Sequence, residues 1–109
     1  MHELSITQSI VEACSERAAG ARVCRVTVEI GRLTCVLPDA LRFCFEVCAE
    51  GTSLQGAELE IIRIPGRARC RACGGEVAAD DLITPCGCGS HDLSYVAGEE
   101  LKVKEMELW

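Results

Sequence analysis

The sequence is poor in aromatic side chains and in histidine. Its 109 residues include one Trp, one Tyr and two Phe, and only two His. A hydrophobic core must therefore be built from aliphatic side chains, alanine and thiols, a composition that still folds. Neither His2 nor His91 sits with a nucleophile and an orienting carboxylate in a recognisable catalytic arrangement. We predict that the protein is not an enzyme.

An excess of basic charge is also missing. Seventeen acidic side chains outnumber eleven basic ones, and the net charge of -6 works against binding to nucleic acid or to an anionic membrane. The segment RIPGRARCRAC is locally basic, but no aromatic side chains alternate with its arginines to stack on bases. We interpret Arg63, Arg67, Arg69 and Arg71 as a solvated face or a protein-docking patch.

Long apolar runs and an export signal are absent from the sequence. No uninterrupted apolar run approaches the roughly 18 residues of a membrane span. The N-terminus has no basic segment followed by an apolar one. These features predict a cytoplasmic protein.

Cysteine, in contrast, is abundant. A cytoplasmic chain with nine cysteines points to metal ligands or buried thiols, because that compartment keeps cysteines reduced. Five cysteines are scattered along the chain, and we expect them to be small buried hydrophobic residues. They are Cys14, Cys24, Cys35, Cys44 and Cys48.

Two helices are indicated by periodic apolar residues and by their end signals. Ser5 to Gln8 fits the capping box S-x-x-Q, and apolar residues then recur at helical spacing until Gly20. This pattern predicts a helix over 5–19 that leaves residues 1–3 outside as a short arm. A second helix is predicted to begin at Pro38 and to end before Gly51.

Three strands complete the predicted fold. VCRVTVEIG alternates apolar and polar residues, AELEIIRIP is a second strand that stops at Pro65, and EELKVKEMELW is a last strand. We expect a small three-stranded sheet from 23–32, 57–65 and 99–108, with both helices packed against it. The fold class is therefore mixed α/β (α+β), with a zinc-ribbon-like subdomain inserted at residues 66–97.

The insertion contains the other four cysteines. CRAC places Cys70 two residues before Cys73, and CGC supplies Cys86 and Cys88. Paired cysteines on two tight turns can deliver four thiolates tetrahedrally to Zn(II), and the metal would supply folding free energy that so small a segment lacks. The second pair is C-x-C instead of C-x-x-C, so His91 remains an alternative ligand. A thioredoxin-like site lacks its βαβ pattern, and a disulfide conflicts with the compartment.

A second metal site is possible at the N-terminus. The α-amine of Met1, the amide and imidazole nitrogens of His2, and the amide nitrogen of Glu3 can close fused chelate rings around one metal ion. Square-planar nitrogen ligation favours Ni(II) or Cu(II) over Zn(II). An ordinary solvent-exposed arm is the alternative.

End to end, the chain resembles the HypA/HybF family of hydrogenase nickel-maturation proteins. The segments that carry the resemblance are MHELSI, VTVEIGRL, PDALRFCFE followed by EGT, ELEI, CRAC and CGS. The family's second cysteine pair is usually C-P-x-C-G-S, whereas here Pro85 precedes Cys86 and only Gly87 separates the two thiols.

The resemblance implies a nickel metallochaperone. It implies Ni(II) as transient cargo at Met1, His2 and Glu3, and a structural Zn(II) at the four cysteines, Cys70, Cys73, Cys86 and Cys88. Residues 1–65 and 98–109 would form the nickel-binding domain, and 66–97 the zinc-binding insertion. The implied partners are the GTPase HypB and the large subunit of a [NiFe] hydrogenase. Some relatives also serve urease, which adds urease accessory proteins as a partner class. A zinc-ribbon module that binds protein or nucleic acid without nickel is the alternative function.

Overall fold

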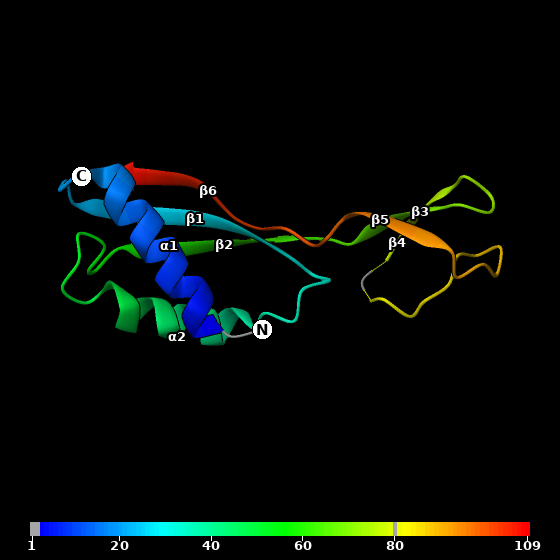
Figure 1. Ribbon diagram of the computed structural model, residues 1–109, viewed down its shortest axis with the longest axis horizontal. Coiled ribbons are helices and arrows are strands. Elements are labelled where there is room, and N and C mark those ends of the chain that lie inside the picture. Colours follow the sequence, from blue (N-terminus) through cyan, green and yellow to red (C-terminus); the bar gives the residue numbers. More distant parts are fainter. Residues whose placement is uncertain (1–2, 80) are drawn as a thin grey trace. The chain divides into compact units, whose positions relative to one another are not determined.

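The computed structural model describes residues 3–79 and 81–109. Along the chain the elements are α1 (Glu3–Ala18), β1 (Val23–Gly31), α2 (Pro38–Ala49), β2 (Glu58–Ile64), β3 (Arg67–Cys70), β4 (Glu76–Ala78), β5 (Leu93–Ala97) and β6 (Leu101–Leu108) (Figure 1). They form two compact units. The first comprises Met1–Val28, Val36–Ile62 and Lys102–Trp109, and the second comprises Glu29–Cys35 and Arg63–Leu101.

The predicted three-stranded sheet is confirmed, with the strand order β2-β1-β6. The helices α1 and α2 pack against each other, and together with the sheet they bury a core of aliphatic side chains and one phenylalanine. The largest buried side chains of this unit are Val23, Val26, Val28, Leu41, Phe45 and Leu54. The mixed α+β class predicted from the sequence is therefore correct.

The predicted start of the first helix is wrong. Ser5 is not the N-cap, because α1 begins at Glu3 and Ser5 lies inside the helix, where its carbonyl accepts a hydrogen bond from the Ser9 hydroxyl at 3.1 Å. The Glu3 carboxylate accepts a hydrogen bond from the amide of Leu37, at 3.2 Å, in the segment that leads into α2. This contact anchors the first turn of α1, so Glu3 is not part of a free arm. Met1 and His2 lie outside the described residues.

The scattered cysteines are less buried than expected. Only Cys14, on α1, is fully buried, whereas Cys24, Cys44 and Cys48 are half-buried and Cys35 is exposed. Cys48 lies 3.5 Å from the hydroxyl of Thr7, so this thiol contacts a polar group between the two helices. Thiols therefore occupy both the centre of the core and its partly exposed edge. Their small size and weak polarity allow both positions.

The second unit is built on an antiparallel sheet with the order β4-β3-β5. Ala68 and Cys70 of β3 are completely buried, and Ala79 and Cys86 are nearly so. Among the described residues of this unit the only large side chain that is fully buried is Ile30, near the end of β1. Such a core buries little apolar surface, and a unit of this size needs another source of stability.

Three glycines allow the backbone of the second unit to pack closely. A Cβ on Gly31 would lie 1.8 Å from the carbonyl oxygen of Gly98, and one on Gly66 would lie 1.7 Å from that of Ala79. Gly98 has φ of 107°, and its Cβ would lie 2.6 Å from the Cα of Gly66. The three segments that carry these glycines can approach this closely only because all three side chains are absent.

Neither helix in the described part of the chain has the length and apolar character needed to cross a membrane.

We predict that Gly66→Ala destabilises the second unit by at least about 2 kcal/mol, because the added Cβ meets a main-chain carbonyl that cannot rotate away. Gly56→Ala is the matched control: its Cβ meets nothing within 4 Å, so only the backbone strain at φ of 80° opposes it, at about 1 kcal/mol. Chemical denaturation of both variants and the parent protein would measure the difference. Equal losses would contradict the packing argument.

Candidate metal centre

The first pair of thiols lies where β3 ends and turns toward β4. Cys70 is the last residue of β3 and Cys73 lies in the turn. The amide of Cys70 donates to the carbonyl of Gly75, and the amide of Gly74 donates to the carbonyl of Cys70, both at 2.8 Å. Gly74 takes a positive φ of 75°, which closes the turn.

The second pair lies in a turn of the same kind that is one residue shorter. The amide of Cys86 donates to the carbonyl of Ser90 at 2.9 Å, and the amide of Gly89 donates to the carbonyl of Cys86 at 2.8 Å. Gly89, like Gly74, has a positive φ, here 91°. In each turn the first cysteine is thus fixed through both its amide and its carbonyl. The C-x-C spacing therefore shortens the turn by one residue but keeps both main-chain hydrogen bonds.

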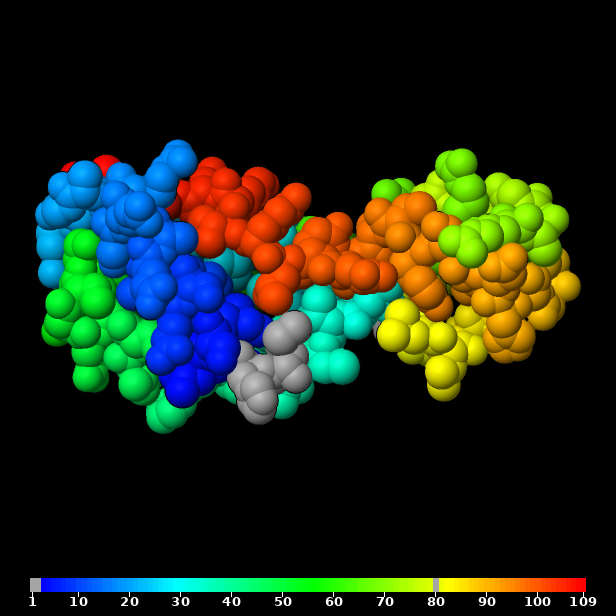
Figure 2. All heavy atoms as spheres, in the orientation of Figure 1, coloured from blue at the N-terminus to red at the C-terminus, as the bar shows by residue number. Residues whose placement is uncertain are grey.

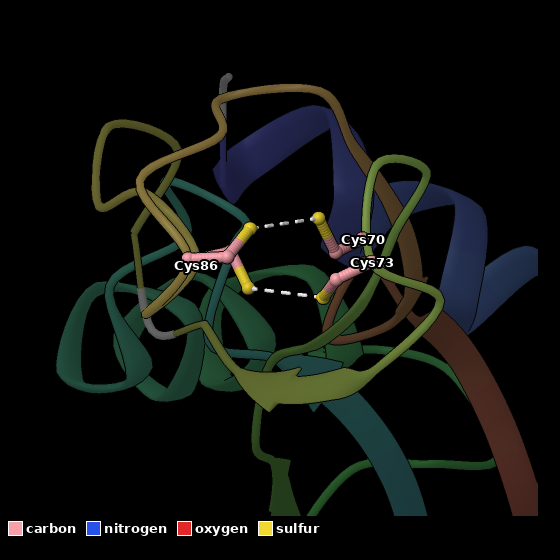
Figure 3. A group of neighbouring side chains, drawn as sticks. Cys70, Cys73 and Cys86 are labelled. Atoms are coloured by element: carbon pink, nitrogen blue, oxygen red, sulfur yellow. Dashed lines mark hydrogen bonds between the residues drawn. The ribbon is translucent and has the colours of Figure 1, made fainter.

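The two turns bring the four sulfurs together. All four lie within 4.8 Å of one another, and the Sγ atoms of Cys70 and Cys88 and those of Cys73 and Cys86 are each 3.7 Å apart. Figure 3 shows the sulfurs of Cys70 and Cys73 pointing toward the turn that carries Cys86. A tetrahedron with metal–sulfur bonds of about 2.3 Å has edges of about 3.8 Å, so the two short pairs fit Zn(II). A disulfide would need about 2.05 Å, and all four cysteines are free thiols.

His91 does not join the four sulfurs. It is exposed, and the group of mutually close ligand atoms found among the described residues consists of Cys70, Cys73, Cys86 and Cys88. The alternative ligand suggested by the short spacing is therefore not needed to complete a set of four.

Main-chain amides favour the first thiolate. Hydrogen bonds from the amides of Cys73 and Ala72 lower the pKa of Cys70 to about 6, against the opposing effect of desolvation. The sequence alone does not reveal these donor amides. The glycines that follow each cysteine pair, however, indicate the tight turns that orient them.

The thiol of Cys86 behaves differently from that of Cys70. The amide of Cys88 lowers the pKa of Cys86, but hydrogen bonding to the neighbouring thiols, together with desolvation, raises it overall to about 11. Converging thiols cannot all lose their protons unless a cation neutralises the charge, which is the property expected of a metal site.

Two of the arginines near this centre pair with acidic side chains. Arg67 contacts Glu76 at 3.1 Å, and Arg71 contacts Asp92 at 3.2 Å. These pairs lie at the surface and contribute little stability, but they neutralise part of the basic segment. These ion pairs favour the interpretation of this segment as a solvated face and argue against a nucleic-acid interface.

Of the three residues predicted to bind nickel, only Glu3 lies among the described residues, as the first residue of α1. Its carboxylate is engaged with the amide of Leu37.

Comparison with known proteins places the chain in a family. The family model described as "Hydrogenase/urease nickel incorporation, metallochaperone, hypA" matches residues 1–108. The chain belongs to the HypA family. It is 55% identical to the hydrogenase maturation factor HypA of Nostoc punctiforme over 108 residues, which cover 99% of this chain and 96% of that one. Identity to the HypA of Geobacter metallireducens is 52% over 109 residues, with 99% of each chain covered.

Solved HypA structures share the fold. The solution structure of the Ni metallochaperone HypA from Helicobacter pylori aligns with a TM-score of 0.70 at 24% identity and covers 99% of this chain and 97% of that one. A second solution structure, of a HypA protein, aligns with a TM-score of 0.75, also at 24% identity. The resemblance seen in the sequence is confirmed at the level of family and fold.

We predict that metal at the four sulfurs is lost as the pH falls. Each ligand must be a thiolate, and protons compete for it; at neutral pH the raised pKa of Cys86 means that binding must displace a proton there. Titration with a chromophoric chelator at decreasing pH should show progressive release. Cys86→Ser should bind less metal at every pH, whereas Cys35→Ser, at an exposed thiol outside the group, should match the parent protein. Release that does not depend on pH would contradict thiolate ligation.

Proposed function

We propose that the protein is a nickel metallochaperone that delivers Ni(II) for the maturation of a [NiFe] hydrogenase. The observation that carries the proposal is the match of the HypA family model to residues 1–108, which includes the N-terminal segment MHE. In this proposal the ligands are the α-amine of Met1, the amide and imidazole of His2, and the amide of Glu3. The role is non-catalytic, and Ni(II) is cargo.

The start of α1 suits such a chelate electrostatically. Amide nitrogens bind metal only after losing their protons, and each then carries a negative charge that offsets the charge of the cation. The N-terminus of a helix carries a partial positive charge that would disfavour a bare cation but favours these anionic nitrogens. The Glu3 carboxylate, held at Leu37, adds a further negative charge beside the site.

Zn(II) is the metal that we propose for the four cysteines. The 3.7 Å sulfur pairs and the all-thiolate donor set support this choice, and four thiolates leave no open position for water or substrate. The metal would then be structural, and would stabilise a unit whose own core is small. Residues 66–97 would be the zinc-binding part, with nickel bound by the part formed by 1–65 and 98–109.

The partners follow from the family. We propose that the GTPase HypB and the hydrogenase large subunit take part in nickel transfer, with urease accessory proteins as a further partner class. All nine cysteines are free thiols, which fits action in the reducing cytoplasm.

We predict that His2→Ala and a short N-terminal extension each abolish tight nickel binding. The extension converts the Met1 amine into an amide but leaves the imidazole unchanged, so it tests the amine directly. Isothermal titration of zinc-loaded protein with Ni(II) would measure both effects. Bound nickel should also be diamagnetic if its ligand field is square planar.

His91→Ala is the matched control, because it removes the other histidine of the chain and should leave nickel binding unchanged. Zinc content and the far-ultraviolet circular dichroism of all variants should equal those of the parent protein. Tight nickel binding by the extended protein would show that the amine is not a ligand. An unmodified chain that binds no nickel would instead favour a zinc-ribbon interaction module.

A further inference from the structure

The helix α2 carries apolar side chains on two sides. Leu41, Phe45 and Ala49 are buried and belong to the core of the first unit. Phe43 and Val47, in contrast, are 67% and 50% exposed, although Phe43 is one of only two phenylalanines in the chain. Figure 2 shows part of α2, in green, at the surface beside α1, in blue. The side of α2 that carries Phe43 and Val47 is therefore left uncovered by the described part of the chain.

The exposed apolar side continues to the start of the helix. Ala40, three residues before Phe43, is half-buried, and Leu37, three residues earlier still, is 65% exposed. Residues three or four apart are neighbours on a helix surface, and Leu37 is the N-cap residue of α2. We call Leu37, Ala40, Phe43 and Val47 the α2 stripe. At a rise of 1.5 Å per residue the stripe is about 15 Å long.

Acidic side chains border the α2 stripe along one side. Asp39 lies four residues before Phe43, and Glu46 lies three residues after it. With 3.6 residues per turn, these two carboxylates fall on the same side of Phe43, and the other stripe residues fall on the opposite side. Glu50, the C-cap residue, continues this acidic row four residues after Glu46. All three acidic side chains are exposed.

The acidic row is not neutralised within the described part of the chain. None of its three carboxylates takes part in an ion pair there. The only basic residue of α2 is Arg42, and its guanidinium donates to the main-chain carbonyl of Leu59 on β2. The three carboxylates are therefore available to cations of another molecule.

An apolar stripe beside an acidic row is complementary to an amphipathic helix whose apolar residues are flanked by lysine or arginine. We propose that the α2 stripe docks such a basic amphipathic helix of a partner protein. The apolar residues of that helix would pack on Phe43 and Val47, and its cations would pair with the acidic row. Large apolar side chains at the centre of an interface, surrounded by charged pairs at its rim, are the arrangement that gives most binding energy.

The acidic row also argues against other occupants of the stripe. Carboxylates repel the phosphates of nucleic acid and of anionic lipid. A second copy of α2 offers no free cation, because Arg42 is engaged on β2. Packing of two copies through this stripe would therefore leave both acidic rows without partners.

One end of the stripe lies beside the start of α1. The amide of Leu37 donates to the carboxylate of Glu3 at 3.2 Å, and Glu3 directly follows Met1 and His2 in the chain. A helix docked along the whole stripe would therefore end close to the proposed nickel ligands. In this respect the inference rests on the proposed function, because the partner would be a protein that gives or receives nickel.

A synthetic peptide tests the docking surface with the zinc-loaded, nickel-free full chain. The probe is a fluorescently labelled helix of leucine and lysine, about 18 residues long because shorter helices are marginal in water. A matched peptide has glutamate in place of every lysine. Fluorescence anisotropy should show saturable binding of one lysine peptide per chain, which weakens as salt is raised, and no binding of the glutamate peptide.

Two variants of the stripe should lose this binding. Phe43→Ala removes the central apolar contact and Glu46→Lys reverses the charge beside it, and we expect each to weaken binding at least about tenfold. Leu82→Ala, at a side chain 61% exposed in the second unit, and Glu16→Lys, on the exposed side of α1, are the matched controls and should bind as the parent protein does. All four positions are exposed, so each variant should keep the circular dichroism of the parent protein.

The site of binding and the oligomeric state complete the test. Amide chemical shifts should change along residues 37–47 when the lysine peptide is added. Equal binding of both peptides, unchanged binding by Phe43→Ala and Glu46→Lys, or shift changes confined to other elements would overturn the proposal. Self-association of the parent protein that Phe43→Ala abolishes would assign the stripe to a second copy, and would also overturn it.

Failure of the docking surface can be told apart from failure of the proposed nickel site. Phe43→Ala should bind Ni(II) as tightly as the parent protein, whereas His2→Ala should bind the lysine peptide normally and lose nickel. Loss of peptide binding in His2→Ala would show that the peptide does not dock on the stripe alone, and would contradict the assignment of the surface.

Discussion

The convergence of four sulfur atoms is the constraint on which the second unit depends. Apart from Ile30, its buried core includes little beyond Ala68, Ala79 and two of the thiols themselves, Cys70 and Cys86. Burial of so little apolar surface cannot offset the conformational entropy of the ordered residues. The amides that favour one thiolate, and the neighbouring thiols that disfavour another, describe a site that becomes stable when a cation is bound. In the proposed function, folding and metal binding are therefore one equilibrium in this unit.

The first unit has a different source of stability. Its aliphatic core lies between two helices and a three-stranded sheet, and it contains none of the four clustered thiols. The Glu3 carboxylate ties the first turn of α1 to the segment before α2. In the proposed function the two sources of stability are separate. Nickel can then bind and leave near the start of α1 without displacing the metal that stabilises the second unit.

The sequence by itself determined the two helices, the three strands of the first sheet and the family, but not the strands β3, β4 and β5 of the second sheet. Alternation in VCRVTVEIG, Pro38 at the start of α2 and the spacing of the cysteines are local patterns, and local patterns report on helices, strands and turns. The start of α1 was missed, because the capping box at Ser5 competes with an anchor from Glu3 to Leu37, 34 residues away, that no local pattern reveals. Only the tertiary structure decided that His91 stays out of the thiol group, that 29–35 belongs to the second unit, and that Gly31, Gly66 and Gly98 meet there. Each of these facts depends on the distance between segments far apart in the chain, and that distance is fixed by packing and not by the order of residues.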